Sequence, residues 1–473
     1  MRRTISTFIL LLPSASFAAG FADLAVSAGA LSGRTFSPPP AEALALPGAE
    51  GADKNFNKWY GADSRQARLR FETWMLYKVP AGYTGAVSRI LDDAGQREKI
   101  EELVRLQLRH MYGAFTMHPG FTDNPGVPSG DYKLRLVRAE KVANEPYAWI
   151  GYTYDDTVVF SAKIFPGGGA QPIRFALPTD PATIYRSGFP RPGARKNLCT
   201  DEHYNSEGDF WYFWNPYQEG CPITEDELIL VETDLEPLPM TRGTYPEYDR
   251  LYGDNGNGPE LKVTYLVGID ESFHSGDLGR GTFRDAFALL KAAGFEVSAD
   301  ENRRKSLYFR RGSARTVIDM RLMDPDSAEF AAAAAEAMRS SDIFLYDGHS
   351  GLGGYLDPER LAADSGAPLA LPRDKYQIFV FQGCSTYAYY NANYFRLKRG
   401  PGDPKGTKNL DIVTTGIGAA FEVGAKADAA FLTSVTMGNR PSWQTIINRI
   451  HAAEGDMTAL THVNGDEDNP TAP

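Results

Sequence analysis

The sequence predicts an α/β fold, in which a mostly parallel sheet carries helices on both faces, preceded by a smaller β-rich α+β domain. Three observations lead to this prediction. At 473 residues the chain exceeds the roughly 250–300 residues that one hydrophobic core serves, so at least two domains are expected. Residues 56–252 contain short segments of alternating apolar and polar residues, which are typical of strands. Residues 261–473 alternate continuous apolar runs with helical patterns, which is typical of a parallel sheet.

The N-terminus has the pattern of a signal peptide over residues 1–18. Two arginines precede an apolar run, and the small residues Ser16 and Ala18 stand where a signal peptidase would cut. A buried N-terminal helix is the alternative, which Pro13 disfavours. We therefore expect an exported protein, periplasmic or secreted. Residues 19–55, rich in Ala, Gly, Ser and Pro, are expected to form a flexible lead-in.

Charge and hydropathy narrow the possible partners. The formal net charge of -11 argues against nucleic acid and against an anionic membrane surface, because both require a basic face. No later apolar stretch reaches the roughly 18–20 residues that cross a bilayer, so no membrane span is expected.

The first domain begins with a helix and continues as strands. Apolar residues recur at helical spacing between Asp93 and Met111, which predicts an amphipathic helix. Alternating runs then predict strands over Tyr132–Val137, Ala148–Tyr154 and Thr157–Phe165.

The three cysteines divide into a pair and a single residue. Cys199 and Cys221 flank a polar and aromatic segment, and an oxidising compartment would join them in a disulfide. A metal site that uses Cys199, His203 and Cys221 is the alternative, but it offers only three ligands and no C-x-x-C pair. Either arrangement leaves Cys384 alone.

Turn residues at 253–260 predict a linker, after which strands and helices alternate. The expected strands include three apolar runs, Leu261–Val267, Ile343–Tyr346 and Ile378–Phe381. The other expected elements are extended segments at Phe295–Ser298 and Ala314–Met320, helices at 282–293, 327–338, 426–437 and 443–453, and a strand at Leu410–Thr414.

Two of these strands end in residues that can perform nucleophilic catalysis. His349 follows the run DIFLYDG and Cys384 follows QIFVFQG. The carboxyl ends of parallel strands share one edge of a sheet, so the two side chains are expected at a common rim. A thiol and an imidazole at one rim are the nucleophile and the acid and base of a cysteine peptidase.

The residues beside the pair suggest how it would be activated. Ser385 and Thr386 are good helix caps, so the Cys384 thiol would lie at the positive end of a helix dipole, which favours the thiolate. The backbone N–H groups of Ser350 or Gly351 and of Cys384 could form an oxyanion hole.

These motifs resemble the caspase, legumain and gingipain group of cysteine peptidases. The likeness rests on a strand that ends in Gly-His followed by one that ends in Gly-Cys, and it covers roughly residues 260–470. The interval from 349 to 384 is 35 residues, shorter than the roughly 50 of caspases, so the gingipain-like branch is nearer. The group usually has Gly where Ser350 stands. The resemblance implies a caspase-like sheet and a peptide or protein substrate, with no metal or organic cofactor in the chemical step.

Several alternatives stay open at the level of sequence. The fold could serve a non-catalytic surface or periplasmic binding protein, or the enzyme could transfer the acyl group to an amine. Asp347 and Gln382 could orient His349 or line the substrate cleft, or they could simply end their strands. Glu422 could favour a basic substrate side chain, or it could be solvated.

Overall fold

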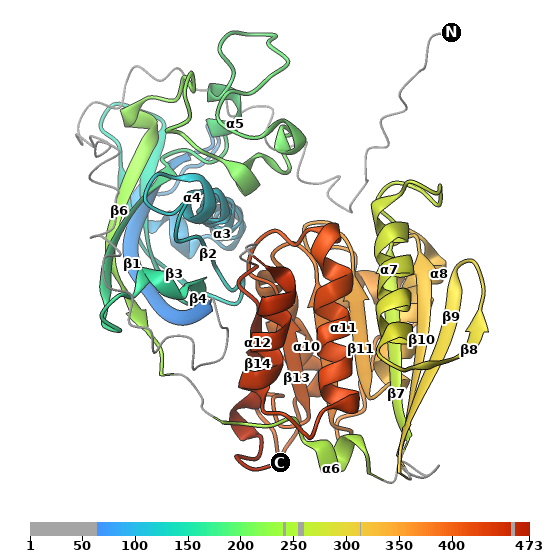
Figure 1. Ribbon diagram of the computed structural model, residues 1–473. Coiled ribbons are helices and arrows are strands. Elements are labelled where there is room, and N and C mark those ends of the chain that lie inside the picture. The colour runs from blue at the N-terminus through green and yellow to red at the C-terminus, as the bar shows by residue number, and fades with distance from the viewer. Residues whose placement is uncertain (1–63, 240–242, 254–259, 313, 456–458) are drawn as a thin grey trace, which may run out of the picture.

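Two sheets form the protein, each built from its own part of the chain (Figure 1). The computed structural model describes residues 64–239, 243–253, 260–312, 314–455 and 459–473. The strands of the smaller sheet all lie within 64–237, and those of the larger sheet all lie within 260–464. The predicted signal peptide and lead-in fall outside the described residues, as does nearly all of the predicted linker.

The smaller sheet is antiparallel and has six strands in the order β2-β4-β1-β6-β5, with β3 also paired to β4. Its strands are β1 (Ser64–Lys78), β2 (Gly126–Val127), β3 (Lys133–Lys141), β4 (Tyr147–Ser161), β5 (Gln171–Pro178) and β6 (Leu228–Pro237). Two helices, α3 (Ala94–Arg109) and α4 (Met111–Met117), pack their apolar side chains into the core of this sheet. Asp93 caps α3 by accepting a hydrogen bond from the Gln96 amide, which confirms the predicted start of that helix.

The strand predicted at 148–154 and the first part of the one predicted at 157–165 form one strand, β4, which ends at Ser161, and residues 162–164 form a short 3-10 helix. Asp155 and Asp156 lie between the two predicted runs, and both have partners within the sheet. Asp155 forms a salt bridge of 2.6 Å with Arg68 of β1. Asp156 is buried and accepts a hydrogen bond from the hydroxyl of Tyr154. The prediction of a break was therefore wrong, because local polarity was outweighed by cross-strand pairing.

The larger sheet has eight strands in the order β14-β13-β12-β11-β7-β10-β9-β8. The run from β13 to β10 is parallel, whereas β14, β9 and β8 are antiparallel to their neighbours. Its strands are β7 (Glu260–Gly268), β8 (Glu296–Asp300), β9 (Arg304–Arg311), β10 (Ala314–Met323), β11 (Ile343–Asp347), β12 (Gln377–Gln382), β13 (Leu410–Thr414) and β14 (His462–Asn464).

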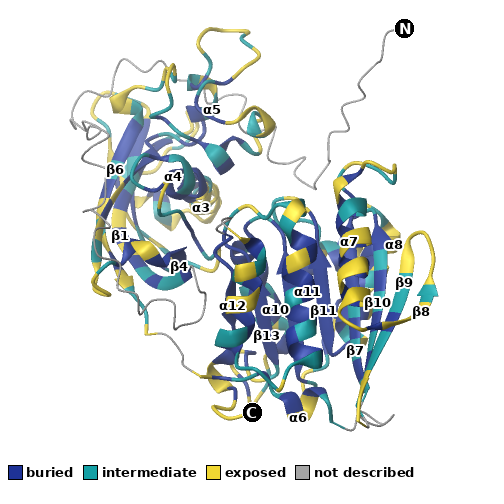
Figure 2. Cartoon of the chain, viewed as in Figure 1, coloured by how far each residue is buried: buried dark blue, intermediate teal, exposed yellow. Residues whose placement is uncertain are grey.

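Helices cover both faces of the larger sheet, as predicted. One face packs on α7 (Leu278–Ala292), α11 (Phe421–Met437) and α12 (Trp443–Glu454). The other packs on α8 (Ala328–Ser340), α9 (Pro358–Ser365) and α10 (Thr386–Lys398). Successive residues of β11 point to opposite faces, so Leu345 lies in the first core and Phe344 in the second. Figure 2 shows the central strands buried, whereas β8 and β9 are more exposed.

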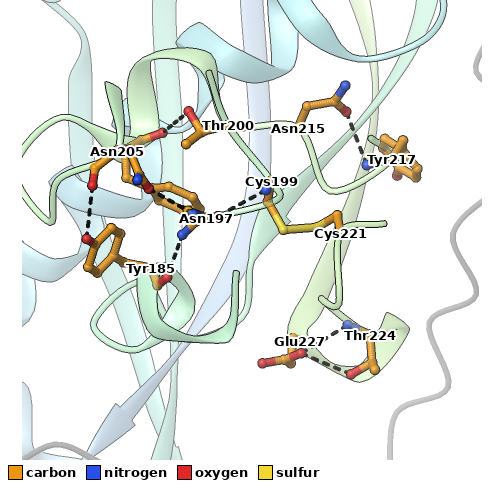
Figure 3. The surroundings of a disulfide bond; sticks show 11 residues. Tyr185, Asn197, Cys199, Thr200, Asn205, Asn215, Tyr217, Cys221, Thr224 and Glu227 are labelled. Carbon is orange, nitrogen blue, oxygen red and sulfur yellow. Dashed lines mark hydrogen bonds between the residues drawn. A yellow bond between two sulfur atoms is a disulfide. The ribbon is translucent and has the colours of Figure 1, made fainter. Parts of the chain in front are cut away.

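The smaller sheet carries the disulfide that the cysteine pattern predicted. Cys199 and Cys221 are bonded, and they close the loop between β5 and β6 (Figure 3). The same loop is held internally, because the Asn197 side chain bonds both the Tyr185 carbonyl and the Cys199 amide. The metal alternative for these cysteines is thereby ruled out. Within the described part of the chain, no helix combines the length and apolarity needed to cross a bilayer.

Candidate active site

His349 and Cys384 follow two neighbouring parallel strands. β11 and β12 pair in register, with Asp347 opposite Gln382, and the Gly348 amide donates a 3.0 Å hydrogen bond to the Gln382 carbonyl. A Cβ atom at position 383 would lie 2.6 Å from the Gly348 carbonyl oxygen, so the close approach of the two loops requires glycine there. The two residues therefore leave the sheet side by side at its carboxyl edge.

Both side chains also contact one short segment that precedes and begins α11. The Cys384 sulfur accepts a hydrogen bond from the backbone N–H of Ala419. The His349 ring packs edge to face on Phe421, with 5.1 Å between ring centroids. Ala419 and Phe421 are two residues apart, which is at most about 7 Å of extended chain. The thiol and the imidazole thus flank the same segment.

The imidazole has an acidic partner that the sequence analysis missed. His349 Nε2 lies 2.8 Å from an Asp270 carboxylate oxygen. Asp270 follows β7, the strand that pairs with β11 on the side away from β12, so three adjacent parallel strands supply Asp270, His349 and Cys384. An ionised carboxylate can only accept a hydrogen bond, so this contact pairs with the His349 tautomer that carries its proton on Nε2. The signal in the sequence was the position of Asp270, just past the apolar run 261–267.

Two tyrosines hold the His349 loop from within the fold. The Tyr346 hydroxyl donates to the His349 carbonyl at 2.7 Å, and the Tyr390 hydroxyl donates to the Ser350 carbonyl at 3.2 Å. Gly348 has a φ of 153°, and a side chain there would meet the Tyr346 hydroxyl at 2.8 Å. The loop is therefore anchored by its backbone, while the His349 side chain stays 47% exposed.

The predicted oxyanion-hole residues lie together in this loop pair. The Cβ position of residue 383 is 3.7 Å from the Ser350 nitrogen, so the Ser350 amide lies beside the peptide that leads to Cys384. Gly351 has a φ of 57°, a conformation that glycine adopts without strain. Ser350 does not adopt a positive φ, so serine in place of the usual glycine costs no backbone strain.

The Cys384 thiol is not activated in the way the sequence suggested. α10 begins directly after it, as predicted, but Ser385 has a φ of 54° and its side chain does not cap the helix. The Ser385 hydroxyl instead lies 2.7 Å from that of Tyr212. Burial raises the pKa of the Cys384 thiol, opposed by hydrogen bonds from the backbone N–H groups of Ala419 and of Cys384 itself. Burial of the thiol therefore opposes the thiolate that the helix terminus was expected to favour.

Aromatic residues of the disulfide loop lie near the thiol. A thiolate at Cys384 would raise the pKa of both Tyr204 and Tyr212, since the three groups are close, although burial is the larger cause for each tyrosine. The two tyrosine rings are stacked with 4.7 Å between centroids. The smaller sheet's part of the chain therefore forms one wall around the nucleophile, which no local motif had indicated.

The three weaker candidates occupy different surroundings. Asp347 is buried against Asp428 of α11, and burial raises the pKa of both carboxyl groups. Gln382 is buried opposite Asp347. Glu422 is exposed in the first turn of α11. Asp347 thus faces α11, and Gln382 ends the neighbouring strand beside it.

No protein-family model matches this chain, and no curated protein matches it significantly. Among the described residues, no group of three or more His, Cys, Asp or Glu side chains is placed to hold a metal ion.

Proposed function

We propose that the chain is an exported cysteine peptidase of the caspase, legumain and gingipain group, with Cys384 as nucleophile, His349 as acid and base, and Asp270 as the residue that orients His349. One observation supports this most strongly: Asp270, His349 and Cys384 follow three adjacent parallel strands, and His349 Nε2 bonds Asp270 at 2.8 Å. A nucleophile, a base and a group that orients the base are the three parts of such a site.

The proposed reaction uses only these side chains and water. The Cys384 sulfur attacks the peptide carbonyl carbon as His349 takes the thiol proton, and the oxyanion is stabilised by the Ser350 and Cys384 amides. His349 then protonates the leaving amine as the C–N bond breaks, which gives a thioester. Water, deprotonated by His349, hydrolyses the thioester and releases the acid and the thiol. If an amine replaces water in this step, the product is a new amide.

Labelling with peptides that carry a chloromethyl ketone tests the proposal. The sulfur displaces chloride from the reagent, so modification of Cys384 reports both the thiol and the peptide site. We expect one label per folded molecule, located on Cys384, and at least about 100-fold slower labelling of His349→Ala, which is the effect typical of a lost acid–base group. His451→Ala, at a partly exposed histidine of α12, is the control.

A non-catalytic binding protein is the second candidate, and the raised pKa of the partly buried Cys384 thiol is the observation that favours it. The binding-protein candidate predicts that folded protein resists the peptide reagent while unfolded protein reacts, and that His349→Ala does not change the rate of labelling.

Product analysis with an added amine would separate hydrolysis from acyl transfer.

A further inference from the structure

A cavity of 230 Å³ lies between the two sheets, next to the proposed nucleophile. Its walls in the larger-sheet part are Ser385, directly after Cys384, and residues 416–418 of the loop after β13. Ala419, which bonds the Cys384 sulfur, is the next residue of that loop. Two lining residues are therefore next to the thiol in sequence or contact. Ser385 follows Cys384, and Gly418 precedes Ala419, whose backbone N–H bonds the sulfur.

The smaller-sheet part supplies most of the other wall. It contributes α4, β2 with the segment before it, and the disulfide loop, through Tyr112, Thr116, Thr122, Val127, Tyr212 and Phe213. The two parts meet closely at this point, because a Cβ at Gly416 would lie 3.2 Å from the Val127 side chain. The hydrogen bond between Tyr212 and Ser385 ties the walls together beside the thiol.

Size and polarity limit what the cavity can hold. A cavity of about 150 Å³ with apolar walls already binds benzene, so this one is large enough for an aromatic ring, yet smaller than the roughly 300–1,000 Å³ of sites for whole ligands. None of the described residues that line it is charged. A lysine or glutamate side chain would be desolvated there without an ionic partner, which is costly.

We infer that this cavity binds an uncharged aromatic or large apolar side chain, on the residue whose carbonyl Cys384 attacks, and that the smaller-sheet part is thus a substrate-binding part of the enzyme. The inference rests on the proposed function. It assigns substrate selectivity to residues of both parts of the chain, including the disulfide loop.

Gly418 offers a direct test, because it lines the cavity and a Cβ there would meet nothing within 4 Å. The reagents are peptidyl chloromethyl ketones with a terminal Phe, Lys or Glu, and iodoacetamide serves as a small thiol reagent. We expect the Phe reagent to label Cys384 at least tenfold faster than the Lys and Glu reagents. Gly418→Leu fills the cavity and should slow the Phe reagent at least tenfold more than it slows iodoacetamide. Gly402→Leu, in an open turn beyond the far end of α10, is the matched control.

Thr122 tests the contribution of the smaller-sheet part, since it lines the cavity and is exposed. Thr122→Glu should favour the Lys reagent, whereas Thr122→Gln should not. Equal labelling by the three reagents, or an unchanged Phe rate in Gly418→Leu, would overturn the inference and leave the peptidase proposal standing. If iodoacetamide alone modifies Cys384 in the wild-type chain, the proposed function itself fails.

Discussion

At the scale of single residues, the pattern of strand ends located two of the three proposed active-site residues. His349 and Cys384 were predictable because each follows a continuous apolar run and a glycine. Asp270 follows an equivalent strand, but the loop that holds it is rich in acidic and small residues, and nothing local distinguishes it. Its role depends on a contact across 79 positions of sequence, which only the order of the strands brings about.

Asp270→Asn should lower kcat for peptide cleavage without a matching rise in KM. The amide can donate to Nε2, which would stabilise the wrong tautomer of His349 and leave Nδ1 protonated. We expect a loss of at least about 10-fold, because acid–base catalysis is typically worth 10²–10⁴-fold. Steady-state kinetics on a peptide substrate would measure it. Asp285→Asn, at an exposed aspartate of α7 paired with Arg284, is the control. Wild-type kcat in Asp270→Asn would exclude the orienting role.

At the scale of elements, continuous apolar runs were easier to predict than strands at the edges of the sheets. β13 has the predicted bounds, and the runs in β7, β11 and β12 were each found to within about two residues. β9 was missed because half of the residues in its sequence, RKSLYFRR, are charged, and its position next to β10 depends on antiparallel pairing rather than on burial. β14 is only three residues long and carries no periodic signal.

α11 contains Gly424, a residue of low helix propensity, at a position where close packing leaves no room for a side chain. A Cβ at Gly424 would lie 2.3 Å from the Asp347 carboxylate, which is buried beneath the His349 loop. Alanine normally stabilises a helix by about 1 kcal/mol relative to glycine. Here the overlap should outweigh that gain, and we expect Gly424→Ala to lower the free energy of unfolding by about 1–3 kcal/mol.

Urea unfolding would measure this change. Gly281→Ala in α7 is the matched control, because its Cβ would meet nothing within 4 Å, and it should be neutral or stabilising by up to about 1 kcal/mol. A Gly424→Ala protein at least as stable as the wild type would show that the Asp347 carboxylate can move aside.

At the scale of the whole molecule, the proposed nucleophile lies at the seam, which is the contact surface between the smaller-sheet part and the larger-sheet part of the chain. Polar contacts cross this seam, from Gln66 of β1 to Asn464 of β14 at 2.9 Å and from the Tyr387 hydroxyl to the Thr157 carbonyl at 3.2 Å. An apolar cluster with members from both parts packs across the seam. The sequence could not predict this seam, because its residues carry no shared motif and are separated by hundreds of positions.

The seam should make the protein sensitive to acid. His462 of β14 is buried there, with its Nδ1 atom 3.0 Å from the Ser64 hydroxyl, and burial lowers its pKa to about 4. The unfolded chain binds this proton near pH 6.5, whereas the folded chain resists it until about pH 4. The stability that depends on neutral His462 is therefore complete above about pH 6.5 and is lost as the pH falls, by about 2–3 kcal/mol at pH 4.5.

Replacing His462 by glutamine should flatten this dependence, because glutamine does not titrate and can still bond Ser64. His110, whose pKa burial also lowers to about 4, would keep part of the acid sensitivity in the variant. Urea unfolding midpoints from pH 7.5 to 4.5 would measure the difference, with His274→Gln as the control for loss of a surface histidine. If wild type and His462→Gln lose stability in parallel over this range, protonation of His462 does not limit the seam, and the acid response must come from the other buried groups.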